Sequence, residues 1–167
     1  LGYDALTHYD RYAPLFESKE EYDFETAKQV VLSSFREFSD TVGSAAAEFF
    51  DKRWIDAEPR KGKRGGAFCM YTTPDLHPFV LLSYLGRKDD IMTLAHELGH
   101  GVHASLARKQ TLFNFSSVLP VAELASTFGE MLVFMRLVGQ SSLEEKLALY
   151  AEKIENIFAT IFRQAAM

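Results

Sequence analysis

Two histidines and a glutamate at helical spacing are the residues in this sequence best suited to chemistry. His96 and His100 lie four residues apart in the segment His96-Glu97-Leu98-Gly99-His100. On an α-helix such a pair projects from one face about one turn apart, so both imidazoles can reach one metal ion. Glu97 lies about 100° around the axis and flanks the ion rather than binding it. This H-E-x-x-H pattern is typical of zinc sites in which the glutamate is the general base for a metal-activated water.

The helix that carries this motif has two distinct predicted faces. With His96 as the reference direction, a period of 3.6 residues places His100 and His103 within about 40° of it. The opposite face is apolar and comprises Ile91, Leu94, Ala95, Leu98, Val102 and Leu106. Gly99 and Gly101 each cost about 1 kcal/mol of helix propensity relative to alanine, which indicates close packing by another part of the chain. We place His103 beside the metal ligands rather than among them.

A catalytic zinc site needs a third protein ligand and an open fourth position. The arrangement H-E-x-x-H-x-x-G-x-x-H is excluded, because His103 and Leu106 occupy its glycine and last histidine positions. The next acidic residue is Glu123, which shares one face of a helix predicted over 120–137 with Glu130. We interpret Glu123 as the third ligand and Glu130 as an acceptor that orients a zinc-binding histidine. The alternative is that these glutamates form an ordinary solvated helix face.

Longer motifs around these residues resemble a known family. Residues 93–103 (TLAHELGHGVH) and 122–130 (AELASTFGE) are similar to the thimet oligopeptidase superfamily of zinc peptidases, and within it to the bacterial oligoendopeptidase F branch. Residues 62–69 (GKRGGAFC) and the His-Pro pair at 77–78 are also similar to that branch. The resemblance covers roughly residues 61–130, and the joint occurrence of these motifs is far more specific than H-E-x-x-H alone.

The resemblance implies a mostly helical, zincin-type core with a deep cleft and one Zn²⁺ per chain. It implies a metalloendopeptidase that hydrolyses short oligopeptides, with His96, His100 and Glu123 as metal ligands and Glu97 as the base. The family draws its oxyanion-stabilising groups from a tyrosine- and histidine-bearing segment well downstream of the third ligand. No such segment precedes Met167, so the activity of this chain alone stays open.

Two alternative functions therefore remain. One is a non-catalytic fragment that binds zinc or a peptide, because the oxyanion-stabilising segment has no counterpart here. The other is a related zinc carboxypeptidase that trims dipeptides from C-termini. Nitrogen and oxygen ligands also accept Co²⁺ or Mn²⁺, so the pattern alone does not establish zinc.

The remaining periodicity predicts a mainly α fold with a small antiparallel β-sheet. We treat residues 1–167 as a single catalytic-core fragment of a longer peptidase, because the chain starts at leucine and a helical pattern is still running at its end. Three regions are expected within it: a helical scaffold over 1–53, a small β region over 54–84, and the helices of the zinc site over 85–167. Helices are predicted over about 24–38, 41–52, 89–107 and 120–137, with a last one from about 141.

The β region holds the candidate substrate contacts. Gly65 and Gly66 permit close backbone approach, so Gly66, Ala67 and Phe68 form a candidate edge strand that hydrogen-bonds an extended peptide. A hairpin buried for structural reasons is the alternative. The basic run 60–64 (RKGKR) does not match the phosphate-binding template G-x-x-x-x-G-K-[ST], and we interpret it as a solvated turn. His77 is interpreted as structural, with a substrate contact as the alternative.

Composition restricts the other function classes. The formal charge of −5, from 18 basic and 23 acidic residues, gives no electrostatic case for nucleic acid. No window of eighteen residues is apolar throughout, so no membrane span is expected. One cysteine among 167 residues rules out an internal disulfide framework and fits a reducing compartment. With no secretory signal visible, these features favour a cytoplasmic enzyme acting on oligopeptides.

Overall fold

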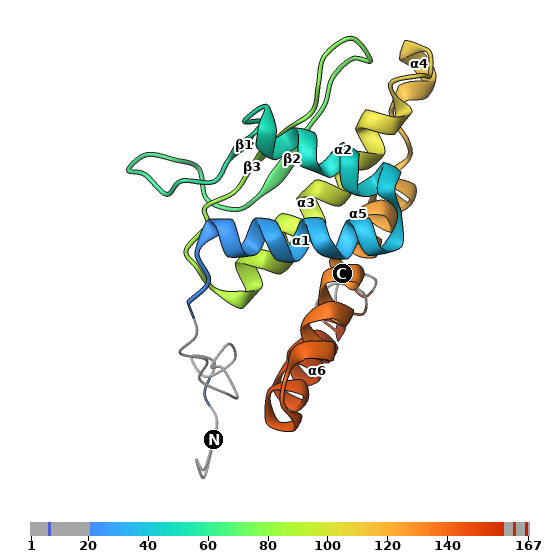
Figure 1. The fold of residues 1–167 in the computed structure, drawn as a ribbon. Helices are drawn as coiled ribbons and strands as arrows, with labels where there is room; N and C mark the ends of the chain where they lie inside the picture. Colours follow the sequence, from blue (N-terminus) through green and yellow to red (C-terminus); the bar gives the residue numbers. More distant parts are fainter. Residues whose placement is uncertain (1–6, 8–20, 159–161, 163–165, 167) are drawn as a thin grey trace. The chain divides into compact units, whose positions relative to one another are not determined.

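The computed structural model describes residue 7, residues 21–158, and residues 162 and 166. By its internal contacts the chain forms two compact units, one of Leu1–Lys19 with Val138–Met167 and the other of Glu20–Leu137. The described part is mainly helical with one small sheet (Figure 1). This confirms the predicted fold class. The start of the predicted helical scaffold lies outside the described residues.

Two helices open the larger unit, α1 (Phe24–Phe38) and α2 (Asp40–Asp51). Asp23 caps α1, because its side chain accepts a hydrogen bond from the Thr26 backbone N–H at 2.7 Å, as N-cap aspartates commonly do. Ser39 adopts an extended conformation between the helices and lets the chain turn back. The two helices pack against each other, and their bounds lie within one residue of the prediction.

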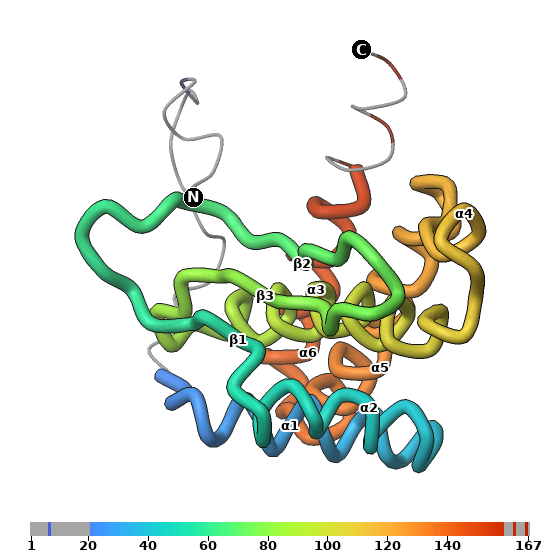
Figure 2. The backbone as a smooth tube through the Cα atoms, turned by 90° about the horizontal axis from the view of Figure 1, so that it is seen from above, coloured from blue at the N-terminus to red at the C-terminus, as the bar shows by residue number. Residues whose placement is uncertain are grey.

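The sheet consists of β1 (Ile55–Asp56), β2 (Phe68–Met70) and β3 (Phe79–Leu81), with β3 in the middle (Figure 2). β2 pairs with β3 in antiparallel fashion, but β1 pairs with β3 in parallel. The predicted antiparallel sheet is therefore wrong in one of its two pairings, and the sheet is mixed. Residues 57–67 reverse the chain and carry β2 to the far side of β3. Because β1 and β2 then run in opposite directions, only one of them can be antiparallel to β3.

Helix α3 (Lys88–Ala107) packs against β2 and β3 and against α1 and α2 (Figures 1 and 2). Its predicted apolar face is buried at Ile91, Leu94, Ala95, Leu98 and Val102. Full burial of a large aliphatic side chain contributes about 1.5–3 kcal/mol, so this face stabilises the helix in position. Leu106 is the exception, since 44% of it is exposed.

Three helices follow α3: α4 (Leu112–Phe115), α5 (Leu119–Gln140) and α6 (Leu143–Ile157). The short α4 lies in the connection between the helices predicted over 89–107 and 120–137, where no helix was predicted. Helix α6 begins with a capping box, in which Ser142 and Glu145 bond each other's backbone N–H groups. No helix in the described part of the chain is both long and apolar enough to cross a membrane.

Helices α3 and α5 approach each other closely at two glycines. A Cβ added to Gly99 would lie 2.6 Å from the Ala125 backbone oxygen and 2.7 Å from the Ser126 Cα. A Cβ on Gly129 would lie 3.0 Å from the Ala95 backbone oxygen. Since these neighbours are backbone atoms of the partner helix, they cannot rotate away. The predicted close packing at Gly99 is confirmed, and its partner is α5.

We expect Gly99→Ala to lower the free energy of unfolding by about 1–3 kcal/mol, because the added methyl forces α3 and α5 apart. Gly139→Ala is the matched control, since nothing lies within 4 Å of its added Cβ, and it should leave stability unchanged or raise it by up to about 1 kcal/mol because alanine is the better helix former. Urea denaturation followed by circular dichroism measures both. Equal midpoints for the two variants would contradict the close crossing.

Candidate metal centre

Three side chains from α3 and α5 converge on one point. Glu123 Oε2 lies 3.4 Å from His96 Nε2 and 3.7 Å from His100 Nε2. One donor atom from each of the three residues lies within 4.8 Å of the other two. Tetrahedral zinc with bonds of about 2.0–2.2 Å separates its ligand atoms by about 3.3–3.6 Å. The spacing and the two-nitrogen, one-oxygen chemistry of this donor set therefore fit zinc.

The two histidine rings are oriented by different partners. His96 Nδ1 lies 3.3 Å from Glu130 Oε2, which leaves Nε2 to face Glu123. This hydrogen bond is the main reason that the pKa of His96 is raised. The His100 ring is hydrogen-bonded to the Ala122 backbone, but burial dominates and lowers its pKa. Such partners fix which ring nitrogen is free to bind a metal.

A buried hydroxyl holds the Glu123 carboxylate. Ser126 is fully buried, and its Oγ lies 2.9 Å from Glu123 Oε2 and 3.0 Å from the Glu123 backbone oxygen, both of which can accept its proton. The neighbouring Thr127 hydroxyl donates only to backbone oxygens, that of Glu123 at 2.6 Å and that of Leu124 at 3.3 Å. Sequence reasoning missed Ser126, although its position three residues after Glu123 on a helix was a usable signal.

Glu97 lies beside the donor group rather than in it. It is 7% exposed, and its carboxylate accepts a hydrogen bond from the Cys69 backbone N–H. Burial, with a smaller contribution from the charge of Glu123, raises the pKa of Glu97, while His96 opposes the shift. The Cys69 side chain is half-buried, and burial raises its pKa to about 12, so it is not a reactive thiolate.

The sheet has two edge strands, β1 and β2. We call the edge formed by β2 the open edge. The Val80 and Leu82 N–H groups donate toward β1, to backbone oxygens of Trp54 and Asp56. The backbone N–H and C=O groups of successive residues in a strand point to opposite sides. The β3 residues on either side of Val80 therefore point these groups toward β2. The register then assigns the β2 groups at positions 68 and 70 to β3 and leaves those at 67 and 69 on the open edge.

This register distinguishes the three predicted substrate contacts. Ala67 directs its backbone groups to the open edge, whereas Phe68 directs its own to β3. Gly66 precedes the strand with a φ of +84°, a conformation that favours glycine. The Cys69 N–H, on the same edge, meets Glu97. The open edge and the metal donors therefore adjoin each other through Glu97.

The remaining histidines of the β region and of α3 are His77 and His103. His77 stacks on Trp54 with ring centroids 4.0 Å apart, and lies 4.5 Å from the Phe79 ring. This position in an aromatic stack supports its structural interpretation. His103 is not in the donor group, and its charge contributes to the lowered pKa of His100; its position beside the ligands stays a prediction.

Comparison with known proteins gives consistent matches over the whole chain. A family model described as Peptidase family M3 matches residues 1–167. The chain is 36% identical to oligoendopeptidase F, chromosomal, of Lactococcus lactis subsp. cremoris, covering 94% of this chain and 26% of that protein. It is 32% identical to oligopeptidase PepF of Bacillus subtilis (strain 168), covering 98% of this chain and 25% of that protein.

A solved structure is similar as well. A crystal structure described as that of a peptidase from Chlamydophila abortus superposes with a TM-score of 0.81 at 33% identity, covering 96% of this chain and 27% of that one. The chain thus spans about a quarter of the length of the relatives it matches.

We expect Ser126→Ala to weaken zinc binding about tenfold, because loss of a hydrogen bond that orients a ligand typically costs at least that much in affinity. Thr127→Ala is the control, since its hydroxyl bonds only backbone oxygens of the same helix. Competition with a chromogenic chelator measures both affinities. If Ser126→Ala binds zinc as tightly as Thr127→Ala, the hydroxyl does not hold the ligand.

The raised pKa of Glu97 predicts a pH-dependent effect on stability. The folded protein holds the Glu97 proton more tightly than the unfolded chain, so this residue costs stability as pH rises above the ordinary glutamate pKa of about 4.3. Without metal, Glu97→Gln should therefore be more stable than wild type at neutral pH, and the gain should shrink toward pH of about 4. Urea denaturation in chelator across this range measures it. If Glu97→Gln were stabilised by the same amount at every pH, the pKa of Glu97 would not be raised in the folded protein.

Proposed function

The chain belongs to peptidase family M3, and from that premise we propose that it carries the zinc site of a metalloendopeptidase that hydrolyses oligopeptides. The observation that supports this most strongly is the convergence of His96, His100 and Glu123 beside the buried Glu97. These three donors would hold the metal. When bound there, zinc would supply Lewis-acid polarisation of the scissile carbonyl and of the attacking water.

The residues of this chain perform the proton transfers in the proposed reaction. Glu97 accepts a proton from the attacking water and delivers it to the departing amine. Its raised pKa suits both steps, because a base with a pKa closer to neutrality is also a usable acid. Glu130 and the Ala122 backbone hold the two histidine rings, so that their orientation need not change during the reaction.

We propose that the substrate binds as an extra strand on the open edge of β2. Ala67 offers both backbone groups there, and Cys69 offers its carbonyl. The Cys69 N–H is already bonded to Glu97, so pairing with a peptide would end next to the general base. This arrangement would place a backbone amide of the peptide, rather than a particular side chain, within reach of Glu97. Relatives named as oligopeptidases are consistent with such recognition.

The two alternatives from the sequence are separated by product analysis. An endopeptidase cleaves an oligopeptide whose two termini are blocked, whereas a strict carboxypeptidase does not. A non-catalytic fragment would bind zinc but leave the peptide intact. The cytoplasmic location stays a prediction, which rests on the single cysteine.

We expect Glu97→Gln, made in the complete protein that carries this sequence, to lower kcat by about 10²–10⁴-fold, as removal of a general base typically does. Zinc content should stay at one per chain, because Glu97 is not a donor. Glu58→Gln, which changes an exposed carboxylate, should leave kcat unchanged. Cleavage of a quenched fluorescent oligopeptide and metal analysis give the result. Full activity of Glu97→Gln would overturn the proposed function.

A further inference from the structure

A buried lysine lies in the loop that joins β1 to β2. The side chain of Lys63 is only 2% exposed, although it belongs to the basic run 60–64 that the sequence led us to interpret as a solvated turn. All residues from Glu58 to Gly66 except Lys63 are exposed. Lys63 is therefore the one residue of this loop whose side chain turns into the body of the protein.

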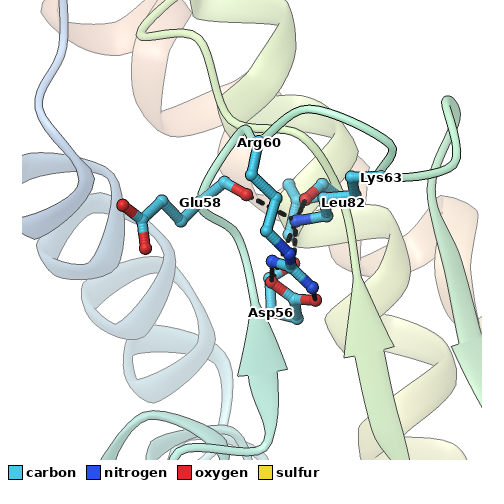
Figure 3. A network of polar contacts seen from close by, with 5 residues as sticks. All are labelled: Asp56, Glu58, Arg60, Lys63 and Leu82. Carbon is cyan, nitrogen blue, oxygen red and sulfur yellow. Dashed lines mark hydrogen bonds and ion pairs between the residues drawn. The ribbon is translucent and has the colours of Figure 1, made fainter.

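Four oxygen atoms surround the Lys63 ammonium (Figure 3). Nζ lies 2.9 Å from the Asp56 backbone oxygen, 3.0 Å from Asp56 Oδ1, 2.9 Å from the Glu58 backbone oxygen and 2.6 Å from the Leu82 backbone oxygen. An ammonium group has three N–H donors and no directional plane. It can therefore serve several oxygens that lie around one point.

These acceptors come from the ends of two strands and from the loop itself. Asp56 is the last residue of β1, and Leu82 follows β3. The adjacent Leu81 pairs with Phe68, the first residue of β2. Ala67 is the fourth residue after Lys63, so the chain between them spans at most about 14 Å. The ammonium thus fixes the loop to the ends of β1 and β3, one residue along the chain from the Leu81–Phe68 pair at which β2 begins.

The register of β2 needs such a constraint. β2 pairs with β3 over only three residues, so few ladder hydrogen bonds hold its register. A Cβ added to Gly65 or Gly66 would meet nothing within 4 Å, so the intervening chain is not held by packing. A slip of one residue would turn the backbone groups of Ala67 and Cys69 from the open edge toward β3. The Cys69 N–H would then no longer reach Glu97.

We infer that Lys63 is a positioning residue that sets the register of the substrate-binding edge of β2. It acts through the backbone of residues 64–69 and touches neither the metal donors nor Glu97. Arg60 does not share this role. Its guanidinium forms two hydrogen bonds with the same Asp56 carboxylate, but its side chain is 56% exposed and bonds no backbone oxygen of the strands. The effect of Lys63 on substrate binding rests on the proposed function, whereas its effect on the register of β2 does not.

The test compares Lys63→Met with Arg60→Met in the complete protein that carries this sequence. Each variant removes one cation from Asp56, and methionine keeps an unbranched apolar stem. We expect Lys63→Met to raise KM for a quenched fluorescent oligopeptide at least about tenfold, with unchanged zinc content and a kcat within about twofold of wild type. Arg60→Met should leave KM within about twofold of wild type. A purely structural role would lower the active fraction, and so kcat, with no change in KM.

Hydrogen exchange provides a readout that does not depend on activity. The amides of Phe68 and Met70, which face β3, should exchange at least about tenfold faster in Lys63→Met than in Arg60→Met, because weaker pairing of β2 opens them. If the wild type cleaves no peptide, the proposed function fails while this measurement still tests the register. If Lys63→Met does not fold, Lys63→Gln keeps donor groups without the charge and should show the same faster exchange. Equal exchange and equal KM in the lysine and arginine variants would overturn the inference.

Discussion

The close crossing of α3 and α5 is the constraint on which the candidate metal centre depends. Two donors lie on α3 and the third on α5, and donor distances of 3.4 and 3.7 Å leave little tolerance for a change in helix separation. Gly99 and Gly129 make this approach possible, because any side chain there would meet backbone atoms. The helix propensity lost at each glycine, about 1 kcal/mol relative to alanine, is therefore offset by the contact that brings the donors together.

Local periodicity made much of this structure predictable. The bounds of α1, α2 and α3 follow from apolar spacing, since the buried face of a helix repeats within the sequence itself. Glu123 was found by elimination along the chain, and the structure brings it to His96 and His100. The sheet was less predictable. β1 pairs with β3 across more than twenty residues, and no local pattern records the direction of such a pairing.

The features that the sequence did not reveal depend on backbone groups or on the direction of one side chain within a charged run. The Cys69 N–H and the Ala122 backbone carry no residue-type signal, although they hold Glu97 and His100. In the run 60–64, four of the five residues are exposed and Lys63 is not. Composition predicts that such a run is solvated. Only the ends of β1 and β3 determine which of its cations turns inward.

Electrostatics connects the candidate metal donors with Glu97, the proposed general base. Glu97, Glu123 and Glu130 place three carboxylates around His96, and their charges contribute to its raised pKa. His100 shows the opposite shift, because it is buried and a second positive charge beside His96 is unfavourable. One positive charge near the three carboxylates is therefore favourable, whereas protonation of both His96 and His100 is not. A divalent cation on neutral Nε2 atoms satisfies both conditions, since it balances the carboxylates without protonating either ring. The same cation would favour the ionised form of Glu97, which burial alone disfavours, and so would keep the base ready to accept a proton.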